Sequence, residues 1–250
     1  MQRTRIEWCD ATINPVKGLC PMDCRDVQGK PYCYARRMYQ RFKWNPEIRY
    51  DPDAFTGLPS KPARVFIGST MELFGDWVNR GWMHMTFAKI LARPQHTFLF
   101  LTKRPEALSQ WIPFPENAWA GVTVTTQADI LNAVNQLMDH RIAQTQFLSI
   151  EPLLHWDTSH WIHPLHMHLS KQDIDWIIIG QQTPVRKATM PKVEWIREIV
   201  QAADRAGIPV FLKDNLAPVL RGHSEFWEDI PQGDHPNYES ISELRQEFPE

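Results

Sequence analysis

Short apolar runs rich in Val, Ile and Phe recur along the chain and alternate with longer segments of mixed polarity. Runs that are apolar at every position are typical of strands whose two faces are both buried, as in a parallel sheet. Seven segments fit this description and are predicted to be strands. They are residues 11–15, 64–68, 97–101, 119–123, 146–150, 176–179 and 210–213.

Between these runs, apolar residues recur at the three- and four-residue spacing of an amphipathic helix. The pattern predicts crossover helices over Asp76–Ala92 and Gln127–His140. A third helix is expected over Pro191–Gly207, because proline suits the first turn of a helix and glycine its end.

Buried strands that alternate with helices predict an α/β fold in which helices cover a parallel sheet. We expect a partial (β/α) barrel of the TIM type over residues 1–216, with a C-terminal extension, residues 217–250, packed on it or trailing from it. An open Rossmann-type sheet is the alternative, but no G-x-G-x-x-G follows the first strand, and polar residues follow several different strands. Residues 40–63, 155–171 and the tail after residue 216 do not fit the repeat and are expected to be loops or caps.

The chain has 27 basic and 29 acidic residues, a formal net charge of -2. The whole molecule therefore has no general attraction for nucleic-acid phosphates, and such a contact needs a local basic patch. No stretch approaches the roughly 18 apolar residues that a membrane span requires, and the first residues lack the apolar core of a secretion signal. We expect a cytoplasmic protein with no membrane partner.

All four cysteines lie within the first 33 residues, at Cys9, Cys20, Cys24 and Cys33. Clustered thiols in a reducing compartment more often ligate metal or take part in redox chemistry than form disulfides. The last three form a C-x3-C-x8-C pattern on a polar loop after the first strand. Three thiolates there suit a [4Fe-4S] cubane whose fourth iron stays open for a substrate or cofactor.

Two alternatives compete with the cluster. Zinc is one, although a structural zinc site prefers four ligands and Cys9 is the only nearby fourth thiol. Free buried cysteines are the other, although three within fourteen residues of a polar loop are hard to explain by packing. Cys9 itself is expected to be a small buried side chain.

These residues resemble the radical S-adenosylmethionine superfamily, whose usual loop is C-x3-C-x2-C with an aromatic residue directly before the third cysteine, the place that Tyr32 occupies. Within that superfamily the chain is similar to the phage Gp37/Gp68 group, also labelled DUF5131, over about the first 215 residues. The motifs that carry the similarity are IEW at 6–8, TINP at 12–15, YCYA at 32–35, FLFLTKRP at 98–105, GVTV at 121–124, LSIEPL at 148–153 and VFLK at 210–213.

The resemblance implies a radical S-adenosylmethionine enzyme with a TIM-like core and a [4Fe-4S] cluster on Cys20, Cys24 and Cys33. In that chemistry the cluster reduces S-adenosylmethionine, the carbon–sulfur bond breaks, and a 5′-deoxyadenosyl radical abstracts hydrogen from a substrate that the sequence does not identify. A reductant such as flavodoxin or ferredoxin is the implied partner. The chain departs from the family pattern between Cys24 and Cys33, where eight residues replace the usual two. We expect residues 25–31 to bulge outward while Tyr32 and Cys33 keep their places.

Polar residues after the second strand are candidate contacts for the cofactor. Ser69, Thr70 and Glu72 stand where the superfamily often has a Gly-Gly-Glu-like turn that binds the methionine amino group. Ser69 and Thr70 suit the ammonium or the ribose, and Glu72 suits the ammonium. The alternative role is capping of the following helix, for which Ser and Thr are well suited.

Three further candidates follow later strands. In related barrels the places of Thr123 and Glu151 contact the ribose and methionine, and Lys213 is a candidate for the cofactor carboxylate or an anionic substrate. Glu151 ends an apolar strand, where a buried carboxylate without a partner costs several kcal/mol. Lys103 and Arg104 have the same position after the third strand, but a solvated helix start explains them equally well.

Two remaining patterns concern partners. Five histidines lie between residues 155 and 168 at spacings that match no defined ligand set, which indicates a packed cap. Basic and aromatic residues interleave at Tyr34, Arg36, Arg37, Tyr39, Arg41, Phe42, Lys43 and Trp44. Such a mixture can stack bases and neutralise phosphates, and it also suits an amphipathic helix beside a cluster. The alternative to a radical enzyme is therefore a non-enzymatic iron–sulfur or zinc protein that binds nucleic acid.

Overall fold

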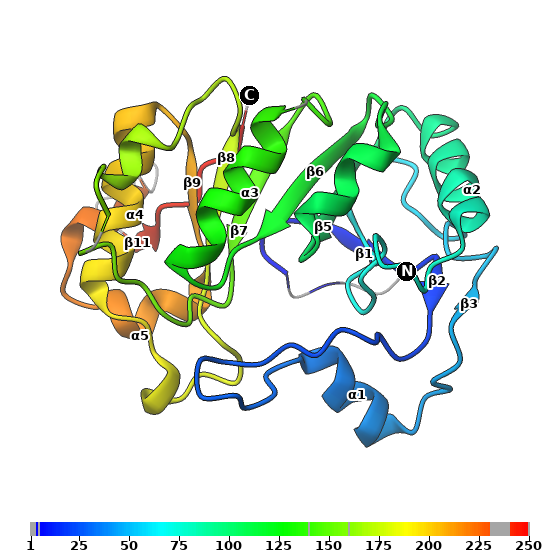
Figure 1. Ribbon diagram of the computed structural model, residues 1–250, viewed down its shortest axis with the longest axis horizontal. Coiled ribbons are helices and arrows are strands. Elements are labelled where there is room, and N and C mark those ends of the chain that lie inside the picture. Colours follow the sequence, from blue (N-terminus) through cyan, green and yellow to red (C-terminus); the bar gives the residue numbers. More distant parts are fainter. Residues whose placement is uncertain (1–3, 5, 140, 160, 231–240, 250) are drawn as a thin grey trace, which may run out of the picture.

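The structure, a computed structural model, describes residues 4, 6–139, 141–159, 161–230 and 241–249 (Figure 1). Its main element is one parallel sheet whose seven strands follow each other in chain order. They are β1 (Ala11–Ile13), β4 (Arg64–Ile67), β5 (Thr97–Thr102), β6 (Ala118–Thr123), β7 (Gln146–Ile150), β8 (Trp176–Ile179) and β9 (Val210–Leu212). The first and last strands do not pair with each other, so the sheet curls without closing. The prediction of a partial (β/α) barrel is confirmed.

Helices connect the strands along the outer side of the sheet. They include α2 (Arg80–Leu91), α3 (Gln127–Asp139) and α4 (Val193–Ala206), while α1 (Tyr34–Phe42) lies apart from them, at the lower side in Figure 1. Helix α2 starts later than predicted, because the Asn79 side chain caps it by accepting from the Gly81 amide at 2.7 Å. Helix α4 is capped at its C-terminus by Gly207, whose φ of 68° suits glycine.

Smaller elements fill the segments outside the repeat. A two-stranded sheet joins β2 (Val16–Lys17) to β3 (Arg49–Tyr50), and a second joins β10 (Trp227–Ile230) to β11 (Ile241–Leu244). The tail also contains α5 (Ala217–Leu220). Short 3-10 helices occupy Pro105–Trp111, Leu165–Met167, Lys187–Thr189, Asp214–Leu216 and Ser224–Phe226. Residues 40–63 and the tail thus contain regular structure that the polar pattern does not predict. In the described ranges no helix is long and apolar enough to cross a membrane.

The sheet separates two apolar clusters. The larger one joins outward residues of the strands, such as Val65 and Phe98, to buried residues of α2, α3 and α4. The smaller one contains no helix residue and therefore lies on the inner face, with Phe66, Phe147, Trp176 and Phe211 among its members. Strand register explains this, since Phe147 pairs with Trp176 and successive side chains alternate between faces.

The C-terminal segment covers the outer edge of β9 at this packed end. Leu212 donates its amide to the Arg245 carbonyl at 2.8 Å, and Glu247 donates to the Val210 carbonyl at 3.0 Å. The Phe248 ring then packs on Trp176, at 5.3 Å between centroids, and lies under the guanidinium of Arg64 at 3.8 Å. Arg64 begins β4, so the tail spans from the last strand toward the first half of the sheet and covers the amino end of the barrel.

Candidate functional site

The inner face changes character toward the carboxyl ends of the strands. Two residues beyond Phe147 on the same face comes Ser149, and two beyond Phe211 comes Lys213. Glu151, just after β7, is the next position on the inward face of that strand. Thr123 is the last inward residue of β6 and pairs directly with Ser149. Polar side chains therefore replace aromatic ones at the end where parallel barrels carry their active sites.

The cysteine loop leaves β1 and is anchored at its start. Gly18 adopts a φ of 128°, and a β-carbon there would lie 2.6 Å from the Glu47 carbonyl oxygen, so only glycine fits. Its amide donates to the hydroxyl of Tyr39 in α1 at 2.8 Å, and the next amide, Leu19, donates to Pro46 at 2.9 Å. These contacts hold the loop between the β2–β3 pair and α1.

The eight residues between Cys24 and Cys33 form a small hairpin that is largely exposed. Arg25 bridges Pro31, the Asp26 and Gly29 backbones close the turn at 2.9 Å, and the Tyr32 amide donates to the Cys24 carbonyl at 3.1 Å. Gly29 has a φ of 77° and no atom near its missing side chain. The extra residues between Cys24 and Cys33 thus protrude as a hairpin, which brings Tyr32 and Cys33 back beside Cys24.

The three thiols of the loop lie within each other's electrostatic reach. A hydrogen bond from Cys24, together with the Arg36 amide at the start of α1, lowers the pKa of Cys33 to about 5. The same thiol contact and burial raise the pKa of Cys24. Burial raises the pKa of Cys20, against a hydrogen bond from the Glu72 amide at 3.4 Å. Cys33 is therefore the most acidic of the three.

Cys33 also caps α1. Its sulfur accepts from the Arg36 amide at 3.4 Å, at the end of the helix where backbone dipoles favour a negative charge. The guanidinium of Arg36 folds back and donates to the carbonyls of Cys20 at 3.1 Å and Met22 at 3.3 Å. Arg36 thus contacts both ends of the cysteine loop, Cys33 through its amide and Cys20 through its guanidinium.

The fourth cysteine belongs to another environment. Cys9 precedes β1, whereas the loop follows it, and it packs into the inner apolar cluster with Trp8. Burial raises its pKa to about 12, which keeps the thiol neutral. Within the described ranges, no three His, Cys, Asp or Glu side chains converge in a way that would hold a single metal ion.

Two tyrosines flank the cysteines. Burial, followed by the charges of Cys24 and Cys33, raises the pKa of Tyr32, so its hydroxyl lies within electrostatic reach of the two thiols. Tyr34 donates its hydroxyl to the Ser69 carbonyl at 2.5 Å. Burial chiefly, and then the charges of Cys33 and Glu151, raise the pKa of Tyr34. Tyr34 thus links the cysteine loop to the turn after β4 and to the end of β7.

The turn after β4 is organised by Asn14, a residue that sequence reasoning did not single out. Its side-chain oxygen accepts from the amide and the hydroxyl of Thr70, both at 3.0 Å, and its amide group donates to the Ser69 hydroxyl at 3.3 Å. Ser69 and Thr70 are therefore held by the end of β1 and do not cap α2, which Asn79 caps.

Glu72 is buried and accepts hydrogen bonds from its own chain. Its carboxylate takes the Thr102 hydroxyl at 2.8 Å, the Lys103 amide at 2.8 Å and the Phe74 amide at 3.1 Å. Burial nevertheless raises its pKa above the ordinary value. Three of about four acceptor positions are thus occupied, and this side chain fastens the β4 turn to the end of β5.

Glu151 and Lys213 form an ion pair across β8. The Lys213 ammonium lies 2.5 Å from Glu151 and 3.6 Å from Glu7, and its side chain is only 10% exposed. Burial by itself lowers the pKa of Lys213, but the two carboxylates outweigh it and hold the pKa above its ordinary value. Gly180, the residue directly after the intervening strand, makes room, because a β-carbon there would lie 2.9 Å from the Lys213 side chain and 3.0 Å from that of Glu151.

The remaining candidates lie around this centre. Thr123 is buried at the end of β6. Thr125 and Thr126, just beyond it, donate to the Asp129 carboxylate of α3 at 2.9 Å and 3.1 Å. Arg104 pairs with Asp76 at 3.0 Å and Glu106 at 3.1 Å in front of a 3-10 helix, which fits the alternative of a solvated helix start.

The histidine-rich segment packs through its rings. His155 lies edge-on to Trp195 at 5.6 Å, and His168 contacts Trp161 at 5.3 Å and His163 at 6.3 Å. His160 lies outside the described residues.

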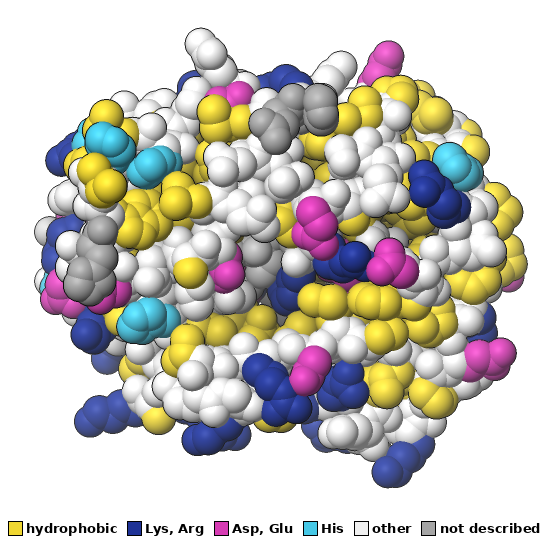
Figure 2. All heavy atoms as spheres, in the orientation of Figure 1, with side chains coloured by type: hydrophobic (Ala, Val, Ile, Leu, Met, Phe, Trp, Pro, Cys, Tyr) yellow, Lys and Arg dark blue, Asp and Glu magenta, His cyan; other side chains and the backbone are white. Residues whose placement is uncertain are grey.

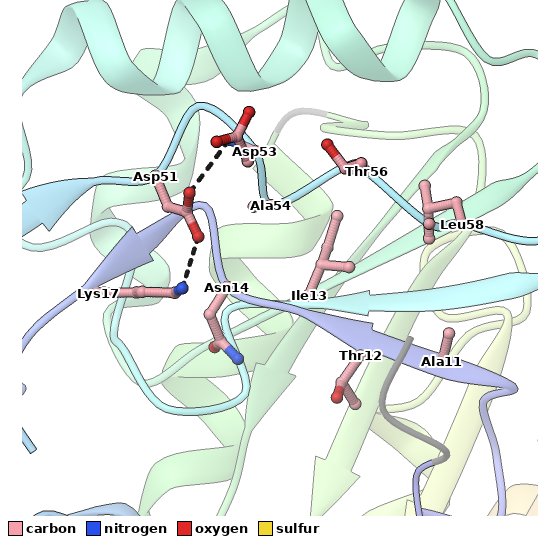
Figure 3. A pocket seen from close by; sticks show the side chains of 11 residues that line it. Ala11, Thr12, Ile13, Asn14, Lys17, Asp51, Asp53, Ala54, Thr56 and Leu58 are labelled. Atoms are coloured by element: carbon pink, nitrogen blue, oxygen red, sulfur yellow. Dashed lines mark hydrogen bonds and ion pairs between the residues drawn. The ribbon is translucent and has the colours of Figure 1, made fainter.

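A cavity of about 330 Å³ lies elsewhere, beside the free edge of β1 (Figure 3). Thr12, Asn14 and the 51–58 segment line it, and none of the cysteines does. Its charged groups are satisfied within the chain, since Lys17 pairs with Asp51 at 2.5 Å and Asp51 also accepts the Asp53 amide at 3.1 Å. The Lys17 ammonium lowers the pKa of Asp51. The ammonium and the carboxylate of this cavity are already paired with each other, so the candidate site stays at the cysteine loop.

Fold and site together define a partial parallel β/α barrel that carries a three-cysteine loop and a buried ion pair at the carboxyl ends of its strands. A sequence model described as "Protein of unknown function (DUF5131)" matches residues 3–217, and the chain belongs to that family. No curated protein matches the chain. Among solved structures, it is similar to "Spore photoproduct lyase complexed with dinucleoside spore photoproduct", with a TM-score of 0.47 and 12% identity, over 98% of this chain and 71% of that one.

Proposed function

We propose that the protein is a radical S-adenosylmethionine enzyme that holds a [4Fe-4S] cluster on Cys20, Cys24 and Cys33. The observation that carries the proposal is that the hairpin returns Cys33 beside Cys24 at the polar end of the barrel, where the charges of the three thiols shift one another's pKa, despite their irregular spacing in the sequence. The proposed substrate of the radical is a molecule that reaches this end of the barrel.

The donor set fits an iron–sulfur cluster. A cubane needs a separate thiolate for each iron that it binds, which differs from the convergent geometry of a single ion. Cys20 and Cys33 each accept a backbone N–H, from Glu72 and Arg36, and such bonds stabilise thiolates and tune the potential of a cluster. Three ligands leave one iron of a cubane free, and Cys9 is packed elsewhere.

When bound, such a cluster supplies the electron that cleaves the carbon–sulfur bond of S-adenosylmethionine and yields a 5′-deoxyadenosyl radical. The chain's own part is to orient the cofactor and exclude water, because a radical reacts with whatever it meets. The aromatic inner cluster and the C-terminal segment fill the barrel below the site. A one-electron donor of the flavodoxin or ferredoxin class would supply the reductant.

The polar residues of the site offer the groups that a bound amino acid needs. Lys213 offers a cation and Glu151 an anion within one ion pair, which suits the carboxylate and ammonium of the methionine portion. Thr123, Ser69 and Thr70 add hydroxyls for the ribose or ammonium. Tyr32 shields the cluster side, and Glu72 acts mainly by holding the turn that presents Ser69 and Thr70.

The test is anaerobic reconstitution with iron and sulfide, followed by dithionite and S-adenosylmethionine. We expect about four irons per chain, an EPR signal that changes on adding S-adenosylmethionine, and release of 5′-deoxyadenosine. Cys20→Ser, Cys24→Ser and Cys33→Ser should each abolish the product and lower the iron content. Cys9→Ala is the matched control and should keep both.

Two results would overturn the proposal. Iron that persists in the triple cysteine variant would place the metal elsewhere. A cluster that forms on these cysteines but never yields 5′-deoxyadenosine would favour the non-enzymatic iron–sulfur protein, and zinc in place of iron in protein isolated without oxygen would favour the zinc protein.

A further inference from the structure

The exposed side of α1 is basic and carries no acidic residue. From Tyr34 to Pro46 the chain has four basic residues, of which Arg36 is committed to the cysteine loop. The other three, Arg37, Arg41 and Lys43, are exposed. Figure 2 shows Lys and Arg side chains along the lower edge of the molecule, where Figure 1 places α1. A local positive region thus exists on a molecule whose net charge is -2.

Aromatic rings stand beside these charges. Phe42 and Trp44 stack at 5.6 Å between centroids and 21° between planes, and they are 48% and 42% exposed. The guanidinium carbon of Arg41 lies over the Phe42 ring, 5.3 Å from its centre, so a positive charge stands beside the stack. Tyr39 contacts Trp44 edge-on at 5.2 Å and fixes it from below. The stack is therefore held in place while both of its residues stay exposed.

A second segment extends the positive region. Arg37 donates to the Thr183 carbonyl at 2.7 Å, which places the loop of residues 183–188 next to α1. This loop is exposed throughout and contributes Arg186 and Lys187, again without an acidic residue. We call Arg37, Arg41, Phe42, Lys43 and Trp44, with the loop 183–188, the basic aromatic face.

We propose that the basic aromatic face binds single-stranded nucleic acid. Proteins that bind single strands combine cations that follow the phosphates with aromatic side chains on which bases stack, and guanidinium planes stack on bases in the same way. A duplex is the poorer ligand, because its bases already stack on each other and offer no free face to Phe42 and Trp44. Charge complementarity and the half-exposed stack thus point to the same ligand.

An acidic protein, such as an electron donor, is the rival occupant, because charge alone would attract it. The rival does not require the stack, and it is therefore separated from a nucleic acid by the aromatic variants below.

The inference deepens the proposed function and rests on it only in naming the substrate class. Cys33 caps the start of α1, and at the other end of the helix the Leu19 amide donates to the Pro46 carbonyl, two residues beyond Trp44, so a strand on this face would lie close to the cysteine loop. Nucleic acid would then be the class of molecule presented to the radical. Binding itself requires neither S-adenosylmethionine nor a reductant, and the two proposals can therefore fail separately.

The experiment measures fluorescence anisotropy of a labelled oligo-dT of about 15 nucleotides, and of a duplex of equal length, at several salt concentrations. The full chain is used, both as isolated and after reconstitution. Phe42→Leu and the double variant with Trp44→Leu test the stack, and Arg41→Gln with Lys43→Gln tests the charge. The matched control is Lys61→Gln with Arg221→Gln, which removes two exposed cations outside the face. Far-UV circular dichroism and thermal melting check that each variant folds.

We expect the single strand to bind more tightly than the duplex, and the double aromatic variant to bind about tenfold more weakly or worse. The charge variant should make the negative slope of log affinity against log salt shallower by about 1.4, because it removes two cations and each single-strand phosphate contact contributes about 0.7. The control should match the wild type.

Three outcomes would overturn the proposal. These are no binding at low salt, an equal loss in the control variant, and binding that is unchanged by the aromatic variants. If instead an acidic flavodoxin binds the protein and the charge variant weakens that binding, while oligo-dT does not bind, the face is a docking site for the reductant.

Discussion

The two ends of the barrel interior are built from the same strands and differ in what those strands place inside. At the amino end, Phe147, Trp176 and Phe211 are fully buried and pack on one another. At the carboxyl end, the next inward positions of β7 and β9 are Ser149 and Lys213, followed by Glu151 after β7, whereas β8 continues with the apolar Ile178. Close-packed rings stabilise the fold at one end, whereas the other end carries an ion pair and the buried Ser149 hydroxyl, which has no hydrogen-bond partner among the described residues.

Along β7 and β9, the residues that pack the core and the polar residues of the candidate site are therefore only two positions apart. A change at the amino end should therefore affect unfolding, and the same kind of change at the carboxyl end should affect activity. Matched substitutions at the two ends test whether stability and activity respond separately.

The largest effect is expected from Trp176→Ala. The substitution removes a fully buried ring and the hydrogen bond from its indole nitrogen to the Glu247 carbonyl at 2.7 Å. The free energy of unfolding should fall by about 3–5 kcal/mol. Ser149→Ala, two positions along the inner face of the neighbouring strand, should change it by less than about 1 kcal/mol because the hydroxyl makes no hydrogen bond. Urea unfolding measures both, and similar losses would refute the division.

A smaller effect is expected from adding one methyl group at either end. In Gly121→Ala the new β-carbon would lie 2.3 Å from the Phe147 ring, which is packed and cannot retreat, so about 1–3 kcal/mol of stability should be lost. In Gly180→Ala the new β-carbon would lie 2.9 Å from Cδ of Lys213 and 3.0 Å from Cδ of Glu151, two side chains that can shift more easily than a packed ring. That variant should lose less stability and more 5′-deoxyadenosine formation. Calorimetry and the product assay compare the two, and the reverse ranking would contradict the scheme.

The smallest effect concerns pH and Glu72. Burial raises its pKa in the folded state, so the folded protein holds this proton more tightly than the unfolded chain does. The resulting stabilisation is complete below the ordinary pKa of about 4.5 and is lost as pH rises through the raised value. Glu72→Gln should flatten the stability curve in that window by on the order of 1 kcal/mol. Urea unfolding at several pH values tests this, with Glu106→Gln as the exposed control; parallel curves would count against it.

Most of the fold could be predicted from local pattern. The seven predicted strands and three predicted helices correspond to β1, β4–β9, α2, α3 and α4, with ends that differ by up to four residues. The strands are apolar on both faces and the helices are amphipathic, so each element is encoded by its own residues. The strands that the pattern does not predict, such as β3 and β10, lack an apolar run because charged residues occupy part of each.

Contacts between distant segments could not be predicted in the same way. Nothing in the sequence near Asn14 indicates that its side chain organises Ser69 and Thr70, which lie 55 and 56 positions away. Glu72 is predicted to bind an ammonium, and the sequence does not indicate the three donors of its own chain that it also accepts. The pairing of Glu151 with Lys213 depends on a glycine in a third strand. Such arrangements result from the sheet register, which brings the strand ends together only in the folded chain.

Because residues 25–31 form a hairpin, the number of residues between Cys24 and Cys33 can vary while the two cysteines stay side by side. Its two strands begin and end side by side, so residues can be added at or removed from the tip, near Gly29, without displacing Cys24 or Cys33. A search that demands a fixed interval between cysteines would therefore overlook chains of this kind. A search for any pair of cysteines separated by a hairpin-compatible insert, with an aromatic residue just before the second, would retain them.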